Sequence, residues 1–399
     1  MADDFPEQHA RRNAAVLACA QALGGANAPI VVSLGGVVGQ MLTEFPALAT
    51  LPVSMFNLGM ALGTLPAAFI MRRYGRRRGY LSASLIGVIA GLTAAYAIVI
   101  GSFLLFCIGT LIAGWYSSYV QSYRFAATDG TSLTFRPRAI SWVMAGGLVG
   151  AIIGPQSVIH TREAWPAFPF AGSFVAQAVL VLLSLPILWW LRDVPLPAPS
   201  AHGSSGRSVR SLFHNPRFVL GVAAGVVSFS LMTLVMTAAP LAMVGCGHSI
   251  GQATLGIQWH VLAMFGPSFF TGRLISRFGA ERITAVGLVA SASAAAVGLA
   301  GIGLGNFYGA LVLIGLGWNF GFIGATAMVA SLCTDAERTR IQAVNDFLVF
   351  GSVAASSFLS GILLNAGGWD LVNMLVFPAV VVVLIPLLWT AGRRQASAG

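Results

Sequence analysis

The stretch Met71–Arg78 reads "MRRYGRRR" and lies between two long apolar runs. A related stretch, Ile275–Arg282, "ISRFGAER", follows 204 residues later. Both carry a glycine, Gly75 or Gly279, after an aromatic residue, and glycine suits a tight turn between helices. The repeat therefore predicts two related halves, each containing a pair of helices joined by a short arginine-rich turn.

The rest of the chain is apolar enough to form such helices inside a membrane. Of its 399 residues, 57% are hydrophobic and 9% are charged, far from the balance of a soluble domain. Apolar runs recur that are long enough to cross about 30 Å of hydrocarbon. We predict an all-α membrane protein of twelve transmembrane helices, spanning residues 14–41, 47–71, 79–100, 102–123, 139–159, 168–191, 218–244, 251–272, 283–303, 306–332, 341–365 and 369–391.

The basic residues indicate which side of the membrane the turns occupy. The chain has no lysine, and in a twelve-span arrangement every arginine except Arg162 falls on the side of the N-terminus. Such segments are cytoplasmic by the positive-inside rule, so both termini are expected in the cytoplasm. The net charge of +10 thus indicates contact with membrane lipid and not with nucleic acid. The acidic, polar start argues against a cleaved signal peptide.

One long polar segment divides the predicted spans into six and six. Residues 192–217 are rich in proline, serine, glycine and arginine and read as a cytoplasmic linker. We predict an N-terminal half at 1–192, a linker at 193–216 and a C-terminal half at 217–399. Thr128–Asp129 and Thr334–Asp335 are a second matching pair between the halves. Paired six-helix halves are typical of secondary transporters that bind substrate between them.

At this point the chain resembles the major facilitator superfamily over essentially its full length. The family's GxLaDRxGRR loop is matched by "AFIMRRYGRR" at 68–77, with Ala68 for the glycine and Arg72 for the aspartate, and by "GRLISRFGAE" at 272–281. The resemblance implies a gating role for Arg72, Arg73 and Arg76. Because the aspartate is missing, we expect Asp346 to pair with one of these arginines across the two halves.

A glycine-rich stretch lies in the fifth predicted span. "GGLVGAIIGP" at 146–155 resembles a pattern associated with exporters of the superfamily. Small residues four apart also permit close helix packing in lipid, whatever the direction of transport. We interpret this stretch as a packing surface.

Four side chains in spans 7 and 8 suggest a substrate site. Met232 and Met236 are spaced i, i+4, as are His260 and Met264, and an intramembrane histidine is a functional hypothesis by default. The two pairs are equidistant from residue 248 in the connecting loop, so they are expected at similar depths. Three thioethers and one imidazole suit Cu(I) better than a hard cation. Spacing alone predicts no more than a soft-metal site.

This arrangement resembles the MxxxM and HxxxM pair of the CcoA-type copper importers, bacterial inner-membrane members of the superfamily. The resemblance implies copper import to the cytoplasm for haem-copper oxidase assembly, with copper as substrate and no permanently bound cofactor. A cytoplasmic copper chaperone or exporting ATPase would follow downstream. Further copper contacts are expected at the outer mouth and at the exit, from Met243, Cys246, His248 and Cys333.

Two other classes of function stay open at this stage. A proton-coupled exporter of small organic or drug-like solutes is common on this fold, but Glu44, Asp129, Asp346 and Asp370 are the only acids near a span, and all lie close to its ends. A membrane assembly or sensor protein without transport is the third class. No GxSxG, Walker or GxGxxG pattern occurs in a plausible context, so we expect no enzyme activity.

Overall fold

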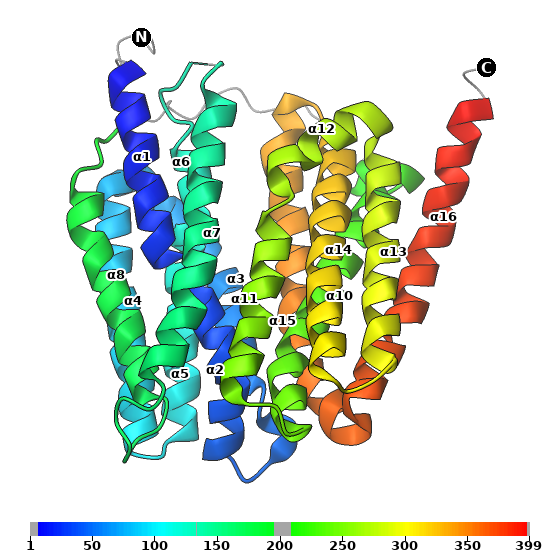
Figure 1. The fold of residues 1–399 in the computed structure, drawn as a ribbon. Helices are drawn as coiled ribbons and strands as arrows, with labels where there is room; N and C mark the ends of the chain where they lie inside the picture. Colours follow the sequence, from blue (N-terminus) through cyan, green and yellow to red (C-terminus); the bar gives the residue numbers. More distant parts are fainter. Residues whose placement is uncertain (1–6, 133, 195–208, 397–399) are drawn as a thin grey trace. The chain divides into compact units, whose positions relative to one another are not determined.

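The computed structural model describes residues 7–132, 134–194 and 209–396, and the secondary structure there is helical throughout (Figure 1). The elements in chain order are α1 (Glu7–Gly24), α2 (Asn27–Leu42), η1 (Pro46–Leu48), α3 (Leu51–Tyr74), α4 (Arg76–Val99), α5 (Phe103–Gln121), α6 (Tyr123–Ala126), α7 (Arg136–Thr161), α8 (Ala171–Trp189), α9 (Val209–Leu212), α10 (Pro216–Gly245), α11 (Ile250–Phe265), α12 (Ser268–Phe278), α13 (Ala280–Leu299), α14 (Leu304–Ser331), α15 (Asp335–Met374) and α16 (Val376–Ala396).

These helices make twelve membrane spans. In the described residues, ten helical segments are long and apolar enough to cross a membrane. One of them, Val344–Thr390, contains two spans, because Gly367 and Gly368 interrupt it with non-helical backbone. The short helices α11 and α12 together form the remaining span. The prediction of an all-α protein with twelve transmembrane helices is therefore confirmed.

Two of the predicted continuous spans are broken at a glycine. The first is divided into α1 and α2 at Gly25, and the eighth into α11 and α12 at Gly266 and Pro267. Glycine lowers helix propensity, and proline lacks the N–H that a helix interior requires. Hydropathy registers only the length of an apolar run, so neither break was predicted.

The two copies of the arginine-rich turn have the same backbone conformation. Gly75, between α3 and α4, has φ +86 and ψ 159, and Gly279, between α12 and α13, has φ +89 and ψ 151. A side chain is strained at these φ values, so glycine is required at both positions. The turns predicted from the repeated sequence are present in both halves.

The described residues form two compact units. Unit 1 comprises residues 1–198 and 250–261, and unit 2 comprises residues 199–249 and 262–399. The boundary inside α11 lies close to the break before α12. The boundaries predicted from sequence, 1–192, 193–216 and 217–399, stay a prediction, and much of that linker (195–208) lies outside the described residues.

Helix α7 packs closely against α1 and the start of α2 in unit 1 (Figure 1). A Cβ added to Gly146 would lie 2.1 Å from the carbonyl oxygen of Ala18, and one on Gly150 would lie 3.0 Å from that of Ala22. Gly154, four residues further on, approaches Ala26 in the same way, at 2.8 Å. The interpretation of "GGLVGAIIGP" as a packing surface is confirmed, because every fourth residue there touches backbone.

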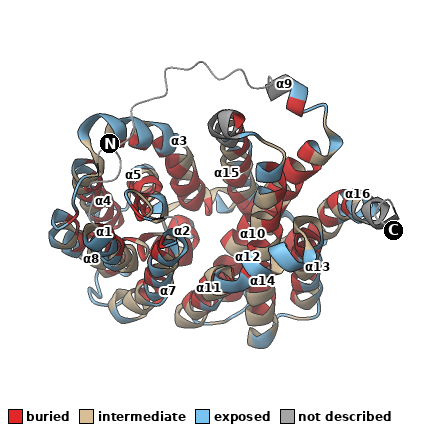
Figure 2. Cartoon of the chain, turned by 90° about the horizontal axis from the view of Figure 1, so that it is seen from above, coloured by how far each residue is buried: buried red, intermediate tan, exposed pale blue. Residues whose placement is uncertain are grey.

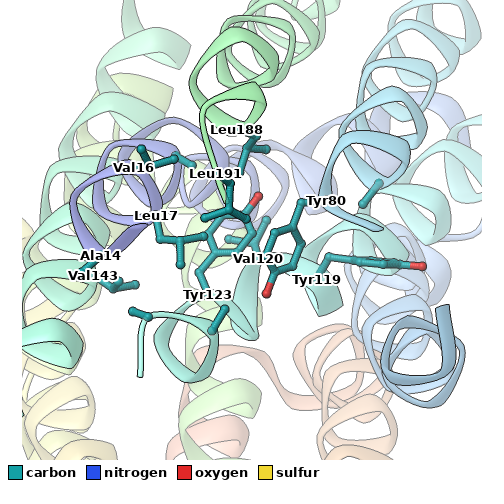
Figure 3. Packing of buried hydrophobic residues seen from close by; sticks show 14 of the residues in the cluster. Ala14, Val16, Leu17, Tyr80, Tyr119, Val120, Tyr123, Val143, Leu188 and Leu191 are labelled. Carbon is teal, nitrogen blue, oxygen red and sulfur yellow. The ribbon is translucent and has the colours of Figure 1, made fainter. Parts of the chain in front are cut away.

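The interior of unit 1 combines aromatic rings with buried polar side chains. Tyr80 and Tyr123 meet edge to face at 4.7 Å between ring centroids, with Leu17, Val120 and other apolar side chains around them (Figure 3). Nearer α2, the amide of Asn27 donates to Ser117 Oγ at 2.7 Å. Such polar side chains join helices in lipid, where an unsatisfied group would be costly.

Unit 2 is organised around α10 and α14. Figure 2 shows buried residues along most of α10, and glycines allow α13 and α14 to touch, because a Cβ on Gly287 would lie 2.1 Å from the nitrogen of Gly321. Asn319 of α14 supports the broken eighth span. Its amide donates to Met264 O at 2.5 Å and to Ser268 Oγ at 2.8 Å, and its oxygen accepts from Thr271 at 2.6 Å. One buried side chain thereby satisfies polar groups on both sides of the break.

Candidate functional site

The four residues predicted to bind copper are mostly buried. Met232 and Met264 are buried and Met236 is half-buried, all in unit 2, whereas His260 is fully buried and belongs to unit 1. Met232 and Met236 lie on α10, and His260 and Met264 lie on α11. Their assembly into one site would join the two units, and it stays a prediction.

The predicted outer-mouth and exit residues have structural surroundings of their own. Met243 is fully buried near the end of α10, and Cys246 is exposed. His248 Nε2 lies 2.8 Å from the carbonyl oxygen of Ile302, and its ring meets Phe307 edge to face. The thiol of Cys333 donates to the carbonyl of Val329 at 3.1 Å. Hydrogen bonding or packing accounts for Met243, His248 and Cys333 without a metal, and a role of the four residues in binding substrate stays a prediction.

Of the predicted gating residues, Arg76 is engaged within unit 1. Its guanidinium forms an ion pair with Asp129, which follows α6, while Arg72 and Arg73 are exposed. Burial raises the pKa of Asp129 above its ordinary value, and the positive charge of Arg76 opposes this rise. Asp346 is half-buried on α15 in unit 2, so its pairing with the arginine turn stays a prediction.

Unit 2 contains a second ion pair beside its own copy of the turn. Arg217, in the first turn of α10, pairs with Glu281, which lies two residues after Gly279. Each arginine-rich turn is thus tied by an ion pair to another element of its own unit. The sequence repeat located both turns, but the ion-pair partners lie 53 and 64 residues apart in the chain and could not be read from it.

Sequence reasoning missed an aromatic cluster inside unit 2. The ring of Phe229, on α10, lies 5.4 Å from that of Trp318 and 5.0 Å from that of Phe322, both on α14. Trp318 and Phe322 are stacked at 5.4 Å with an interplanar angle of 19°. Phe265 of α11 meets Trp318 at 5.9 Å, and Phe350 of α15 meets Phe229 at 6.1 Å. We call these five residues the aromatic cluster.

Several polar groups near the aromatic cluster have no hydrogen-bond partner among the described residues. They include Trp318 Nε1, and the hydroxyls of Ser228, Ser230 and Thr233 on α10. A buried polar group without a partner costs about 1–3 kcal/mol. The only sequence signal for this region was the i, i+4 spacing of Trp318 and Phe322, because the other rings come from three further helices.

The chain is similar to known membrane transporters. Residues 14–297 match the Major Facilitator Superfamily. The riboflavin transporter RfnT of Brucella anthropi is 59% identical over 390 residues, which cover 98% of this chain and 98% of that protein. The MFS-type transporter YdeG of Bacillus subtilis, named as uncharacterized, is 31% identical over 96% of this chain and 93% of its own length.

Solved structures share the fold at much lower identity. A point mutant of the nucleoside transporter NupG superposes with a TM-score of 0.72 at 14% identity, covering 95% of this chain and 99% of that one. The POT family transporter PepTSo gives a TM-score of 0.71 at 12% identity, covering 98% of each chain. At such identities the comparison shows the fold alone.

The relative from Brucella anthropi contradicts copper import. A protein 59% identical along nearly its whole length is named for transport of riboflavin, a vitamin without a metal. The copper assignment rested on a resemblance carried by two i, i+4 pairs, and methionine at that spacing also serves as apolar packing. Copper as substrate, oxidase assembly, and the downstream chaperone or ATPase are therefore withdrawn.

The fold and the family match lead to the same conclusion. The described residues form twelve apolar membrane spans, and the same glycine turn occurs in both units. The superfamily match covers well over half of the chain. The chain is a multi-pass membrane protein, a transporter and not an enzyme, and it belongs to the Major Facilitator Superfamily.

Proposed function

We propose that this protein carries riboflavin across the membrane as a secondary transporter. The observation that carries the proposal is the 59% identity to the riboflavin transporter RfnT over 98% of both chains. Two transporters that are 59% identical along nearly their whole length are expected to share a substrate class. The same expectation does not hold for the solved structures, which are 12–14% identical to this chain.

The chemistry of riboflavin fits the kinds of side chain in the membrane interior. Riboflavin joins a flat, uncharged aromatic ring system to a chain of hydroxyl groups. Ligand sites for such molecules combine aromatic surface with a few hydrogen-bonding groups. Unit 2 contains the aromatic cluster together with polar side chains such as Ser230 and Thr233 on α10.

Uptake measurements test the proposal directly. We expect the gene to restore growth at low riboflavin to a bacterial strain that can neither make nor import the vitamin, and to raise uptake of labelled riboflavin. Copper uptake, measured in the same cells, is expected to stay at the level of the empty vector. Normal membrane insertion with no riboflavin movement in either direction would contradict the proposal.

We also propose the orientation that the arginines predict. The protein lies in a bacterial inner membrane with both termini and the linker at 193–216 in the cytoplasm, by the positive-inside rule. The loop after α10 then faces outward and carries the exposed Cys246. A membrane-impermeant maleimide should label intact cells and fail to label Cys246→Ser cells. Equal labelling of the two would contradict this orientation.

A further inference from the structure

The aromatic cluster of unit 2 is not sealed like an ordinary apolar core. Trp318 is 7% exposed, but Phe229, Phe265, Phe322 and Phe350 are all half-buried. Side chains that project fully outward from the same unit are far more exposed, such as Phe347 at 78%. The five rings therefore form a partly open surface where α10, α11, α14 and α15 meet.

Unpartnered polar groups occur within this aromatic surface. Trp318 Nε1 is buried with no hydrogen-bond partner in the described part of the chain, and so is the hydroxyl of Thr233. Thr233 lies one helical turn after Phe229 and thus on the same face of α10. Hydrocarbon would leave such groups unsatisfied at a cost, whereas a ligand with carbonyl oxygens and ring nitrogens could accept from them.

A flat heteroaromatic ligand fits both properties. Aromatic side chains bind planar rings by offset stacking and edge-to-face contact, the geometries already present among Phe229, Trp318 and Phe322. The isoalloxazine ring of a flavin is planar, its pyrimidine part carries two carbonyl oxygens and the acceptor nitrogen N1, and N5 of the central ring is a further acceptor. It therefore offers both the stacking surface and the acceptors that the cluster lacks.

We propose that Phe229, Trp318 and Phe322, flanked by Phe265 and Phe350, form the surface on which the isoalloxazine ring stacks during transport. This inference rests on the proposed function, riboflavin transport, and adds which part of the molecule is recognised and by which residues. Trp318 Nε1 donates to an acceptor on the ring edge once the cluster opens. Phe229 and Phe322 supply the ring contacts.

Competition for binding separates recognition of the isoalloxazine ring from recognition of the ribityl chain. Binding of riboflavin to the purified full-length protein is followed by quenching of flavin fluorescence. Lumiflavin, which has the ring system with a methyl group in place of the ribityl chain, should compete within about tenfold of riboflavin itself. Ribitol, which has the chain alone, should not compete. Competition by ribitol without competition by lumiflavin would overturn the proposal.

Substitutions test the named residues. Stacking of a planar ring on an aromatic side chain stabilises binding, so Phe229→Leu and Trp318→Leu should each weaken riboflavin binding about 5- to 150-fold. Phe229→Tyr keeps an aromatic ring and should bind riboflavin like the wild type. Trp318→Phe should bind more tightly than Trp318→Leu but more weakly than the wild type, because it keeps an aromatic ring and lacks the indole N–H. The matched controls Phe347→Leu and Trp389→Leu change aromatic residues that are 78% and 59% exposed, and should bind like the wild type.

The outcomes distinguish the site from the function. If the wild type binds and carries riboflavin while monodisperse Phe229→Leu and Trp318→Leu proteins bind it equally well, the stacking surface is wrong and riboflavin transport stands. If the wild type neither binds nor carries riboflavin, both proposals fail. Loss of binding in the control variants as well would also overturn the site, since the effect would then not depend on the aromatic cluster.

Discussion

Two adjacent glycines in α7 should respond to alanine with opposite signs. A Cβ on Gly146 would lie 2.1 Å from the carbonyl oxygen of Ala18, whereas the nearest atom to a Cβ on Gly147 is Gln21 Nε2 at 3.7 Å. Ordinary contact begins at 3.4 Å, so Gly146→Ala requires α7 and α1 to separate by 1.3 Å (3.4 minus 2.1). The obstacle is backbone and cannot rotate away.

The magnitudes follow from packing and helix propensity. Overpacking costs about 1–3 kcal/mol, and a backbone clash belongs at the upper end of this range. Alanine in place of glycine returns up to about 1 kcal/mol of helix propensity. Gly146→Ala should therefore lower the free energy of unfolding by about 2 kcal/mol. Gly147→Ala gains the propensity term without the clash and should raise it by up to about 1 kcal/mol.

Unfolding of both variants in mixed micelles, titrated with SDS and followed by circular dichroism, measures the difference. Gly147→Ala serves as the matched control, since it makes the same chemical change one residue away. Riboflavin uptake should fall in Gly146→Ala cells, because the seam between α1 and α7 is displaced. Equal stability of the two variants, or a less stable Gly147→Ala protein, would refute the packing argument.

Three further predictions follow from the described contacts. Asn319→Ala removes three hydrogen bonds at the break between α11 and α12 and should lower the free energy of unfolding by about 2 kcal/mol in the same titration. The control Asn306→Ala removes one bond to Val297 and should lower it by less than about 1 kcal/mol, so equal losses would contradict the role of Asn319. Burial raises the Asp129 pKa in the folded protein, so the wild type loses stability as pH rises through the raised pKa, whereas Asp129→Asn stays neutral and does not. The stability of the wild type relative to Asp129→Asn should therefore fall as pH rises from about 4 towards 7, and a relative stability that rises would contradict this sign. Met232→Leu preserves volume at a buried position, with a packing cost below about 1.5 kcal/mol, and should leave yield and riboflavin uptake near wild type; abolished uptake at normal yield would show that the sulfur is needed.

The contrast between the correct and the incorrect inferences from sequence has a physical basis. The glycines of the two turns and of α7 were interpreted correctly because each acts through its own backbone or through its own helix face. Copper import was inferred from a family resemblance that depended on side-chain spacing within two helices. Such spacing says which residues share a face, but not what lies opposite that face, so packing and ligand binding look alike.

The sequence by itself determined the number and nature of the membrane spans, because hydrocarbon imposes a length and an apolar composition on every span. It also indicated the repeat and the tight turns, which depend on residues close together in the chain. Tertiary structure alone decided how the spans break and how Arg76 and Asn319 find their partners. It also decided the aromatic cluster, whose rings come from positions 229, 265, 318, 322 and 350. Those side chains meet because four helices pack together, and apolar residues separated by dozens of positions carry no local signal of that meeting.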